Sequence, residues 1–214
     1  RPEIIKLAPV ILEMKKFPQD YNVLICNTEQ QKDLSNQTLE YFGLKADISL
    51  DCMRENQSLA SVQTRILNSL DKIYNDYQID ATIVQGDTMT VLCGALASFY
   101  HKIPVFHVEA GLRSYDKYEP FPEEVIRQMV SRIADLHFAP TDVNKQALLK
   151  ENIDNDKICV VGNTVIDALF CLSEDVISQA KKFYEENNIE INDKLILITA
   201  HRRENHGERI DRII

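Results

Sequence analysis

The chain alternates short, continuous apolar runs with longer segments in which apolar residues recur every three or four positions. The apolar runs cover residues 23–26, 81–84, 105–108, 136–139, 158–161 and 195–198. Continuous runs of this length are typical of strands that are buried on both faces of a parallel sheet. Helical periodicity covers residues 59–77, 89–100 and 126–133, and we expect a helix in each of these segments.

This succession of strand, helix and strand predicts an α/β fold with a doubly wound, Rossmann-like parallel sheet. A first helix is expected at the start of the chain, because Pro2 suits the first helical turn. No strand precedes that helix, and the run at 195–198 follows a polar segment at 185–194. We therefore expect one nearly complete domain over residues 1–163, lacking its first strand, and the beginning of a second over residues 164–214, with both ends truncated.

Composition and charge narrow the classes of function. The 214 residues carry 33 acidic and 24 basic side chains, which gives a formal net charge of −9. A surface this acidic argues against binding nucleic acid or an anionic membrane over a broad area. No apolar run is long enough to span a bilayer. The five cysteines include no C-x-x-C pair, so we expect free thiols in a reducing cytoplasm and no zinc site.

Charged side chains follow several predicted strands, at the edge where open α/β sheets bind their ligands. Carboxylates, a histidine and cations gathered at one edge suit proton transfer on an anionic substrate. Motifs for other chemistry, such as a phosphate-binding glycine loop or an H-E-x-x-H zinc site, are absent. The edge residues are Asp87, Glu109, Arg113, His201 and Arg202, together with Arg1 in the turn before the first helix.

Several of these residues also have a purely structural explanation, and the pattern alone leaves both open. Asp87 precedes the predicted helix at 89–100 and suits a helix cap. Glu109 and Arg113 suit a structural ion pair, and the pair Glu123-Glu124 suits the first turn of a helix. The histidines inside predicted strands, which we expect in the core rather than in a site, are His107 and His137.

Six motifs spread over the whole chain closely resemble those of the bacterial non-hydrolysing UDP-N-acetylglucosamine (UDP-GlcNAc) 2-epimerases. In order, they are Arg1-Pro2-Glu3-Ile4-Ile5-Lys6-Leu7-Ala8-Pro9, Gly86-Asp87-Thr88, His107-Val108-Glu109-Ala110-Gly111-Leu112-Arg113, Pro122-Glu123-Glu124, Gly162-Asn163-Thr164-Val165-Ile166-Asp167-Ala168 and His201-Arg202-Arg203-Glu204-Asn205. The resemblance implies a two-domain architecture of the GT-B type, with the substrate in the cleft between domains. It also implies a homodimer that uses no metal and no cofactor.

The resemblance further implies reversible conversion of UDP-GlcNAc to UDP-N-acetylmannosamine (UDP-ManNAc), which feeds the synthesis of surface polysaccharides. UDP leaves to give 2-acetamidoglucal and then adds back. The family pattern makes Asp87, Glu109 and Glu123 the acid/base carboxylates, and it makes His201 a catalytic residue that contacts the diphosphate and helps it to leave. Arg1 and Lys6 match substrate-contacting positions. Together with Asp87, Glu109 and His201, the expected substrate-binding set also includes Arg113 and Arg202.

Three alternatives remain beside this hypothesis. One is a 2-epimerase that acts on a modified UDP-sugar of the diacetamido uronic acid type. Another is a glycosyltransferase of the same GT-B architecture, which would leave the hydrogen at C2 of the sugar in place. The third is a non-catalytic module that binds a nucleotide sugar, and we expect the isolated 214 residues to be inactive. The resemblance implies that the residues binding uridine follow residue 214.

Overall fold

The computed structural model of the chain describes residues 2–28, 32–52, 54 and 57–190. These residues divide into two compact units, with the division between Leu172 and Ser173. The second unit contributes one described helix, α8 (Glu174–Glu186), whose N-terminus is capped by the Ser173 hydroxyl. All other described elements belong to the first unit, so α7 (Val165–Phe170) is part of it. The predicted domain division after residue 163 stays a prediction.

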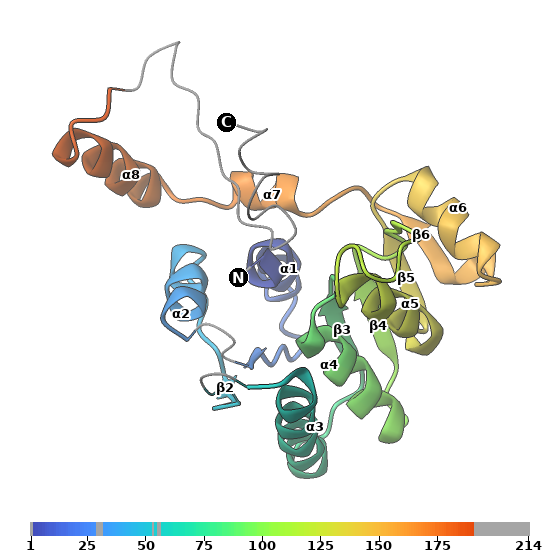
Figure 1. Cartoon of the computed structure of the whole chain (residues 1–214). Helices are drawn as coiled ribbons and strands as arrows, with labels where there is room; N and C mark the ends of the chain where they lie inside the picture. Colours follow the sequence, from blue (N-terminus) through green and yellow to red (C-terminus); the bar gives the residue numbers. More distant parts are fainter. Residues whose placement is uncertain (1, 29–31, 53, 55–56, 191–214) are drawn as a thin grey trace. The chain divides into compact units, whose positions relative to one another are not determined.

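The strands of the first unit form two parallel sheets. One pairs β1 (Cys26–Asn27) with β2 (Ile48–Ser49). The other has four strands in sequential order, as Figure 1 shows. Its strands are β3 (Thr82–Gln85), β4 (Val105–Val108), β5 (Leu136–Ala139) and β6 (Ile158–Val160). The α/β fold with parallel sheets is therefore confirmed, although the strands form two sheets where the apolar runs suggested one.

Helices connect the successive strands. These helices are α2 (Lys32–Tyr41), α3 (Leu59–Asp76), α4 (Met89–Tyr100), α5 (Glu123–Ile133) and α6 (Asp142–Lys150), and α1 (Pro2–Met14) precedes β1. Since β3, β4, β5 and β6 are parallel neighbours, each connecting helix must return along the sheet before the next strand begins. The carboxyl ends of all four strands consequently lie at the same edge of the sheet.

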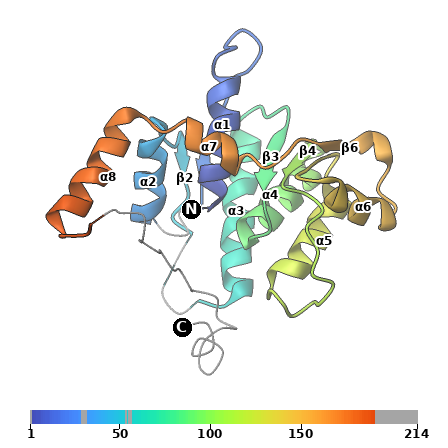
Figure 2. The same ribbon diagram turned by 90° about the horizontal axis from the view of Figure 1, so that it is seen from above.

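Four apolar clusters hold the helices in place in the described residues, and the last of them packs α6 against β5 and β6 around Leu148. In the first, α4 and α5 pack on β3 and β4 through residues such as Val84, Leu92 and Ile126. In the second, α3 packs against α4 and the segment after β2, around the fully buried Ile66. In the third, α1 packs against α2 and α7 around Ala8. Because α1 also contacts β3, that strand lies between α1 and α4 (Figures 1 and 2).

Three predicted elements agree with the structure at both ends. The helix at 89–100 and the strands at 105–108 and 136–139 have the predicted bounds. The run at 23–26 overlaps β1 only at Cys26, because the observed strand begins three residues later than predicted, although Ile25 O accepts a hydrogen bond from Ile48 N at 3.1 Å. The run at 195–198 lies outside the described residues. No helix in the described part of the chain is both long and apolar enough to cross a membrane.

Candidate active site

The register of the sheet brings the first two predicted carboxylates together. Gln85, the last residue of β3, is paired with Val108, the last residue of β4. Gly86 N then donates a hydrogen bond of 3.1 Å to Val108 O, which keeps the two segments side by side just beyond the strands. Asp87 is the first charged residue after β3 and Glu109 is the first after β4, so both lie at the carboxyl edge of the sheet.

Glu109 is the most heavily bonded residue of this edge. Lys6 Nζ, from α1, lies 2.6 Å from both carboxylate oxygens. Gln85 Nε2 donates to Oε2, and Asn163 Nδ2, from the segment after β6, donates to Oε1 at 3.1 Å. Glu109 has a φ of +64°, a left-handed conformation that costs an L-residue about 1–2 kcal/mol. Four segments of the first unit therefore meet at a single carboxylate, and its partner is Lys6 rather than Arg113.

Asp87 forms an ion pair with α5. Its Oδ2 lies 2.7 Å from a terminal nitrogen of Arg127. Burial raises the pKa of Asp87 above its ordinary value, and the negative charges of Glu123 and Glu109 raise it further, whereas Arg127 lowers it. The N-cap of α4 is Thr88, whose side chain makes no capping hydrogen bond. Asp87 is thus a partner of Arg127, and its raised pKa is typical of a group that exchanges protons.

Glu123 and Glu124 both lie in the first turn of α5 but have different surroundings. Glu124 is fully buried and accepts hydrogen bonds from Ser114 N at 2.9 Å, Tyr115 N at 3.2 Å and Gln128 Nε2 at 2.8 Å. Burial alone would raise the pKa of Glu124, but these donors outweigh it and the pKa lies below its ordinary value. Glu123 is partly exposed, and no side chain in the described ranges pairs with its carboxylate. Glu124 is therefore structural, while Glu123 is accessible to a ligand beside Asp87.

Arg113 does not join this cluster. Its side chain is only 1% exposed, and its Nε and one terminal nitrogen donate to the two carboxylate oxygens of Glu151 at 2.6 and 2.8 Å. Further donors go to Ser131 Oγ at 2.9 Å and to Leu112 O at 2.6 Å. A guanidinium with its donors used in this way ties the loop after β4 to α5 and to the residue that follows α6. Substrate binding by Arg113 stays a prediction that these contacts do not support.

The two strand histidines are core residues, as expected. His107 and His137 are paired across β4 and β5 and are each 1% exposed. Burial lowers the pKa of both to about 4, so both are neutral at pH 7. His107 Nε2 lies 2.8 Å from Gly86 O, where a protonated nitrogen donates to the carbonyl. His107 thus supports the turn that carries Asp87.

Three predicted site residues, Arg1, His201 and Arg202, lie outside the described residues. Conversely, Gln85, Asn163 and Arg127 had no predicted role. Two of them, Gln85 and Arg127, carried a signal in the sequence. Gln85 is a polar side chain at the end of a buried strand, and Arg127 follows Glu123 by four residues, which places both on one face of a helix. What the pattern lacked was the identity of their partners.

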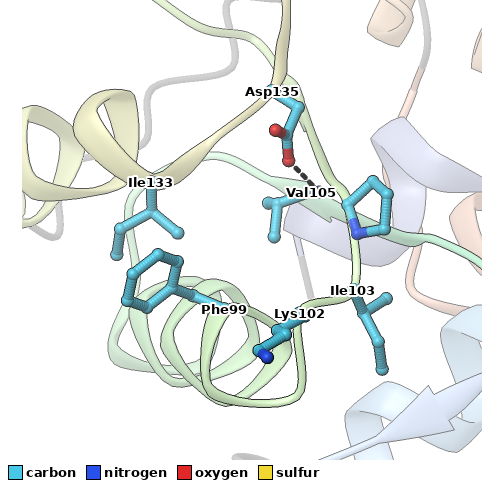
Figure 3. Close-up of a pocket in the computed structure, with 7 residues that line it drawn as sticks. Phe99, Lys102, Ile103, Val105, Ile133 and Asp135 are labelled. Atoms are coloured by element: carbon cyan, nitrogen blue, oxygen red, sulfur yellow. Dashed lines mark hydrogen bonds between the residues drawn. The ribbon is translucent and has the colours of Figure 1, made fainter.

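A pocket of about 280 Å³ lies at the opposite edge of the sheet, where β4 and β5 begin (Figure 3). Phe99, Ile103 and Ile133 line it, and Asp135 Oδ2 accepts a hydrogen bond of 2.8 Å from Val105 N. None of the predicted site residues lines this pocket. Within the described ranges, no group of three or more His, Cys, Asp or Glu side chains has the arrangement of a metal site. The acidic carboxyl edge is therefore the candidate active site.

Known proteins resemble this chain over its whole length. A family model described as UDP-N-acetylglucosamine 2-epimerase matches residues 13–214. UDP-N-acetylglucosamine 2-epimerase of Neisseria meningitidis is 48% identical over 216 residues, which cover 100% of this chain and 58% of that protein. The protein of the same name from Bacillus subtilis is 47% identical, over 99% of this chain and 54% of its own length. The chain thus spans just over half the length of these relatives.

A solved structure agrees with the sequence comparison. The crystal structure of UDP-GlcNAc 2-epimerase from Neisseria meningitidis, bound to UDP-GlcNAc, matches with a TM-score of 0.87 and 48% identity. The match covers 97% of this chain and 57% of that one. The resemblance predicted from the six motifs is confirmed, and so is the Rossmann-like α/β fold. This chain belongs to the UDP-N-acetylglucosamine 2-epimerase family.

Proposed function

We propose that the protein interconverts UDP-GlcNAc and UDP-ManNAc without hydrolysing them. The observation that carries this proposal is the gathering of Asp87, Glu109 and Glu123 at one edge of the sheet, where the charges of Glu109 and Glu123 act on Asp87. A 2-epimerase must remove and return a proton at C2 of the sugar, and carboxylates perform such transfers. The names of the relatives and the UDP-GlcNAc bound in the Neisseria structure support the choice of substrate.

The proposed reaction has two halves. One carboxylate takes the proton from C2, the electron pair of the C–H bond forms a C1=C2 double bond, and the bond from C1 to the oxygen of UDP breaks. This gives 2-acetamidoglucal and UDP. In the return step UDP bonds to C1 again, and a proton reaches C2 from the opposite face. Such a scheme needs acid/base groups on both faces of the ring, and Asp87 and Glu123 enter the site from the N-termini of different helices, α4 and α5.

Cations are required to retain UDP between the two halves. Lys6 has three N–H donors and directs two of them to the oxygens of Glu109, which leaves one donor for a phosphate oxygen. We assign Arg1, His201 and Arg202 to the same diphosphate on the strength of the family resemblance. The GT-B arrangement and a uridine site in a second Rossmann-like domain belong to this proposal as well.

The test follows the hydrogen at C2. The full-length protein is incubated with UDP-GlcNAc in D2O, and both nucleotide sugars are analysed by NMR and mass spectrometry. UDP-ManNAc with deuterium at C2 is the expected product. Epimerised product that keeps its original hydrogen would exclude the elimination mechanism. Transfer of the sugar to an acceptor would favour a glycosyltransferase, and binding of UDP-GlcNAc without turnover would favour a non-catalytic module.

We also propose that the enzyme is a homodimer in the cytoplasm and that it supplies ManNAc units for surface polysaccharide. The family resemblance is the basis for the dimer and the pathway. The basis for the compartment is the cysteine pattern of the sequence, which has an odd number of cysteines and no C-x-x-C pair. Analytical ultracentrifugation of the full-length protein is expected to give twice the mass of one chain.

A further inference from the structure

Arg127 is the side chain that connects Asp87 to the interior of the first unit. One terminal nitrogen lies 2.7 Å from Asp87 Oδ2, and the other lies 3.7 Å from Glu124 Oε2. The Arg127 side chain is 12% exposed, and its Nε is buried without a hydrogen-bond partner in the described part of the chain. A buried donor left unpaired is costly. Since Nε has no partner among the described residues, the contacts of the two terminal nitrogens with Asp87 and Glu124 are what orient the guanidinium.

Arg127 is itself held in place. Glu124, its second carboxylate, is fully buried and receives the backbone N–H groups of Ser114 and Tyr115. Glu124 and Arg127 are three residues apart on α5, so the helix fixes their separation. The contacts thus run without a gap from the loop after β4, through Glu124 and Arg127, to Asp87. This arrangement gives the Asp87 carboxylate one defined orientation.

The charges around Asp87 make this contact important. Glu123 on α5, Glu109 after β4 and Glu3 on α1 all act on Asp87 and disfavour its ionised form, in addition to the effect of burial. Arg127 acts in the opposite direction. A bound diphosphate adds further negative charge to the same edge. The ionised form of a carboxylate is disfavoured in such surroundings, and a cation beside it offsets part of this effect.

We propose that Arg127 is a positioning residue for proton transfer: it aims the Asp87 carboxylate and keeps it ionised until the substrate is bound. This role rests on the proposed epimerase function. It does not require Arg127 to touch the sugar. Removal of Arg127 leaves Asp87 beside three other carboxylates, so its pKa rises and it becomes protonated at higher pH.

The first arm of the test needs no catalysis. The Asp87 resonance of full-length protein labelled with 13C at aspartate carboxyl carbons is assigned with Asp87→Asn and followed from acidic to neutral pH. In Arg127→Gln the midpoint of the Asp87 titration is expected at higher pH than in the wild type. Arg127→Lys, which keeps the charge but not the planar fork, is expected to lie between them. Arg132→Gln, on the exposed face of the same helix, is the matched control and leaves the midpoint unchanged.

The second arm measures turnover by deuterium incorporation. In Arg127→Gln, kcat is expected to fall by up to about a hundredfold, while KM stays within about threefold of the wild-type value. The acidic limb of the plot of rate against pH is expected to move to higher pH. Arg127→Lys recovers part of the rate. An unchanged Asp87 midpoint and an unchanged pH profile in Arg127→Gln would overturn the inference. If Arg127→Gln does not fold, Arg127→Lys decides by the same two readouts. A wild type without epimerase activity would contradict the proposed function alone, since the titration still reports on Arg127.

Discussion

At the scale of single residues, the site shows how two adjacent and identical side chains acquire different roles. Glu123 and Glu124 share the first turn of α5, where the helix dipole favours either one. The direction of each side chain makes the difference. Glu124 points inward to backbone N–H groups of the loop after β4, and Glu123 stays accessible near Asp87. The helix-start explanation fits both residues, but it does not distinguish between them.

A pair of matched substitutions tests this division. Glu124→Gln replaces a buried carboxylate whose oxygens accept two backbone N–H groups, so it should destabilise the protein by about 2 kcal/mol or more. Glu123→Gln should change stability by less than about 1 kcal/mol, and it should reduce turnover about a hundredfold or more. Urea unfolding and the deuterium assay measure the two effects. Equal stability losses in both variants would contradict the assignment of Glu124 as the structural residue.

At the scale of elements, the turn after β4 depends on a glycine as well as on Glu109. Gly111 has a φ of +86°, and a Cβ at this position would lie 2.4 Å from Asn144 O, at the start of α6. The loop can therefore approach α6 only without a side chain here. The backbone contact between Gly111 and Asn144 thus fixes the middle of the segment that carries Glu109 and Arg113.

We predict that Gly111→Ala destabilises the protein by about 3 kcal/mol, because left-handed strain and a backbone clash add. Gly43→Ala is the control, since Gly43 has a φ of +64° but open space around its Cβ position. The strain alone should cost about 1 kcal/mol there. Thermal and urea unfolding compare the two variants. A loss at Gly111 no larger than that at Gly43 would show that α6 yields to the added methyl group.

The elements also show what the sequence could predict. The predicted bounds at 105–108 and 136–139 hold because these strands are buried enough to give continuous apolar runs. Helix α2 (Lys32–Tyr41) was missed because its sequence is mostly polar, and β2 (Ile48–Ser49) was missed because it has two residues. In general, periodicity reports burial, so weakly buried or very short elements leave little trace in it.

For the site, the same logic predicted positions but not partners. Strand ends indicated Asp87 and Glu109, because a polar residue after a buried strand lies at the ligand-binding edge. The spacing suggested Arg113 for Glu109, four residues away, whereas the structure pairs Glu109 with Lys6, 103 residues away. Such a pairing depends on how α1 lies against β3, which no local pattern contains.

At the scale of the whole molecule, the paired histidines make stability depend on pH. His107 and His137 have a pKa of about 4 in the folded protein, lowered chiefly by burial, against about 6.5 in an unfolded chain. Between these values the unfolded chain binds more protons, so the free energy of unfolding falls as the pH drops from 6.5 to 4. Above pH 6.5 this contribution is fully present. Each histidine accounts for about 3 kcal/mol over the window.

His107→Gln tests this effect, since an amide N–H can still reach Gly86 O but cannot titrate in this range. Urea unfolding followed by circular dichroism at a series of pH values should show a shallower pH dependence in the variant. The two proteins are best compared by the slope of the unfolding free energy against pH, so that a uniform loss of stability does not matter. Identical slopes would contradict a neutral, buried His107.

The central claim is that carboxylates far apart in the sequence surround one nucleotide sugar. A crystal structure of the full-length protein with UDP-GlcNAc bound tests it most directly. We predict that C2 of the sugar lies within about 3.5 Å of an oxygen of Asp87, Glu109 or Glu123, and that Lys6 faces the diphosphate. UDP-GlcNAc bound away from the carboxyl edge of β3 and β4, with these carboxylates out of reach of C2, would contradict the account.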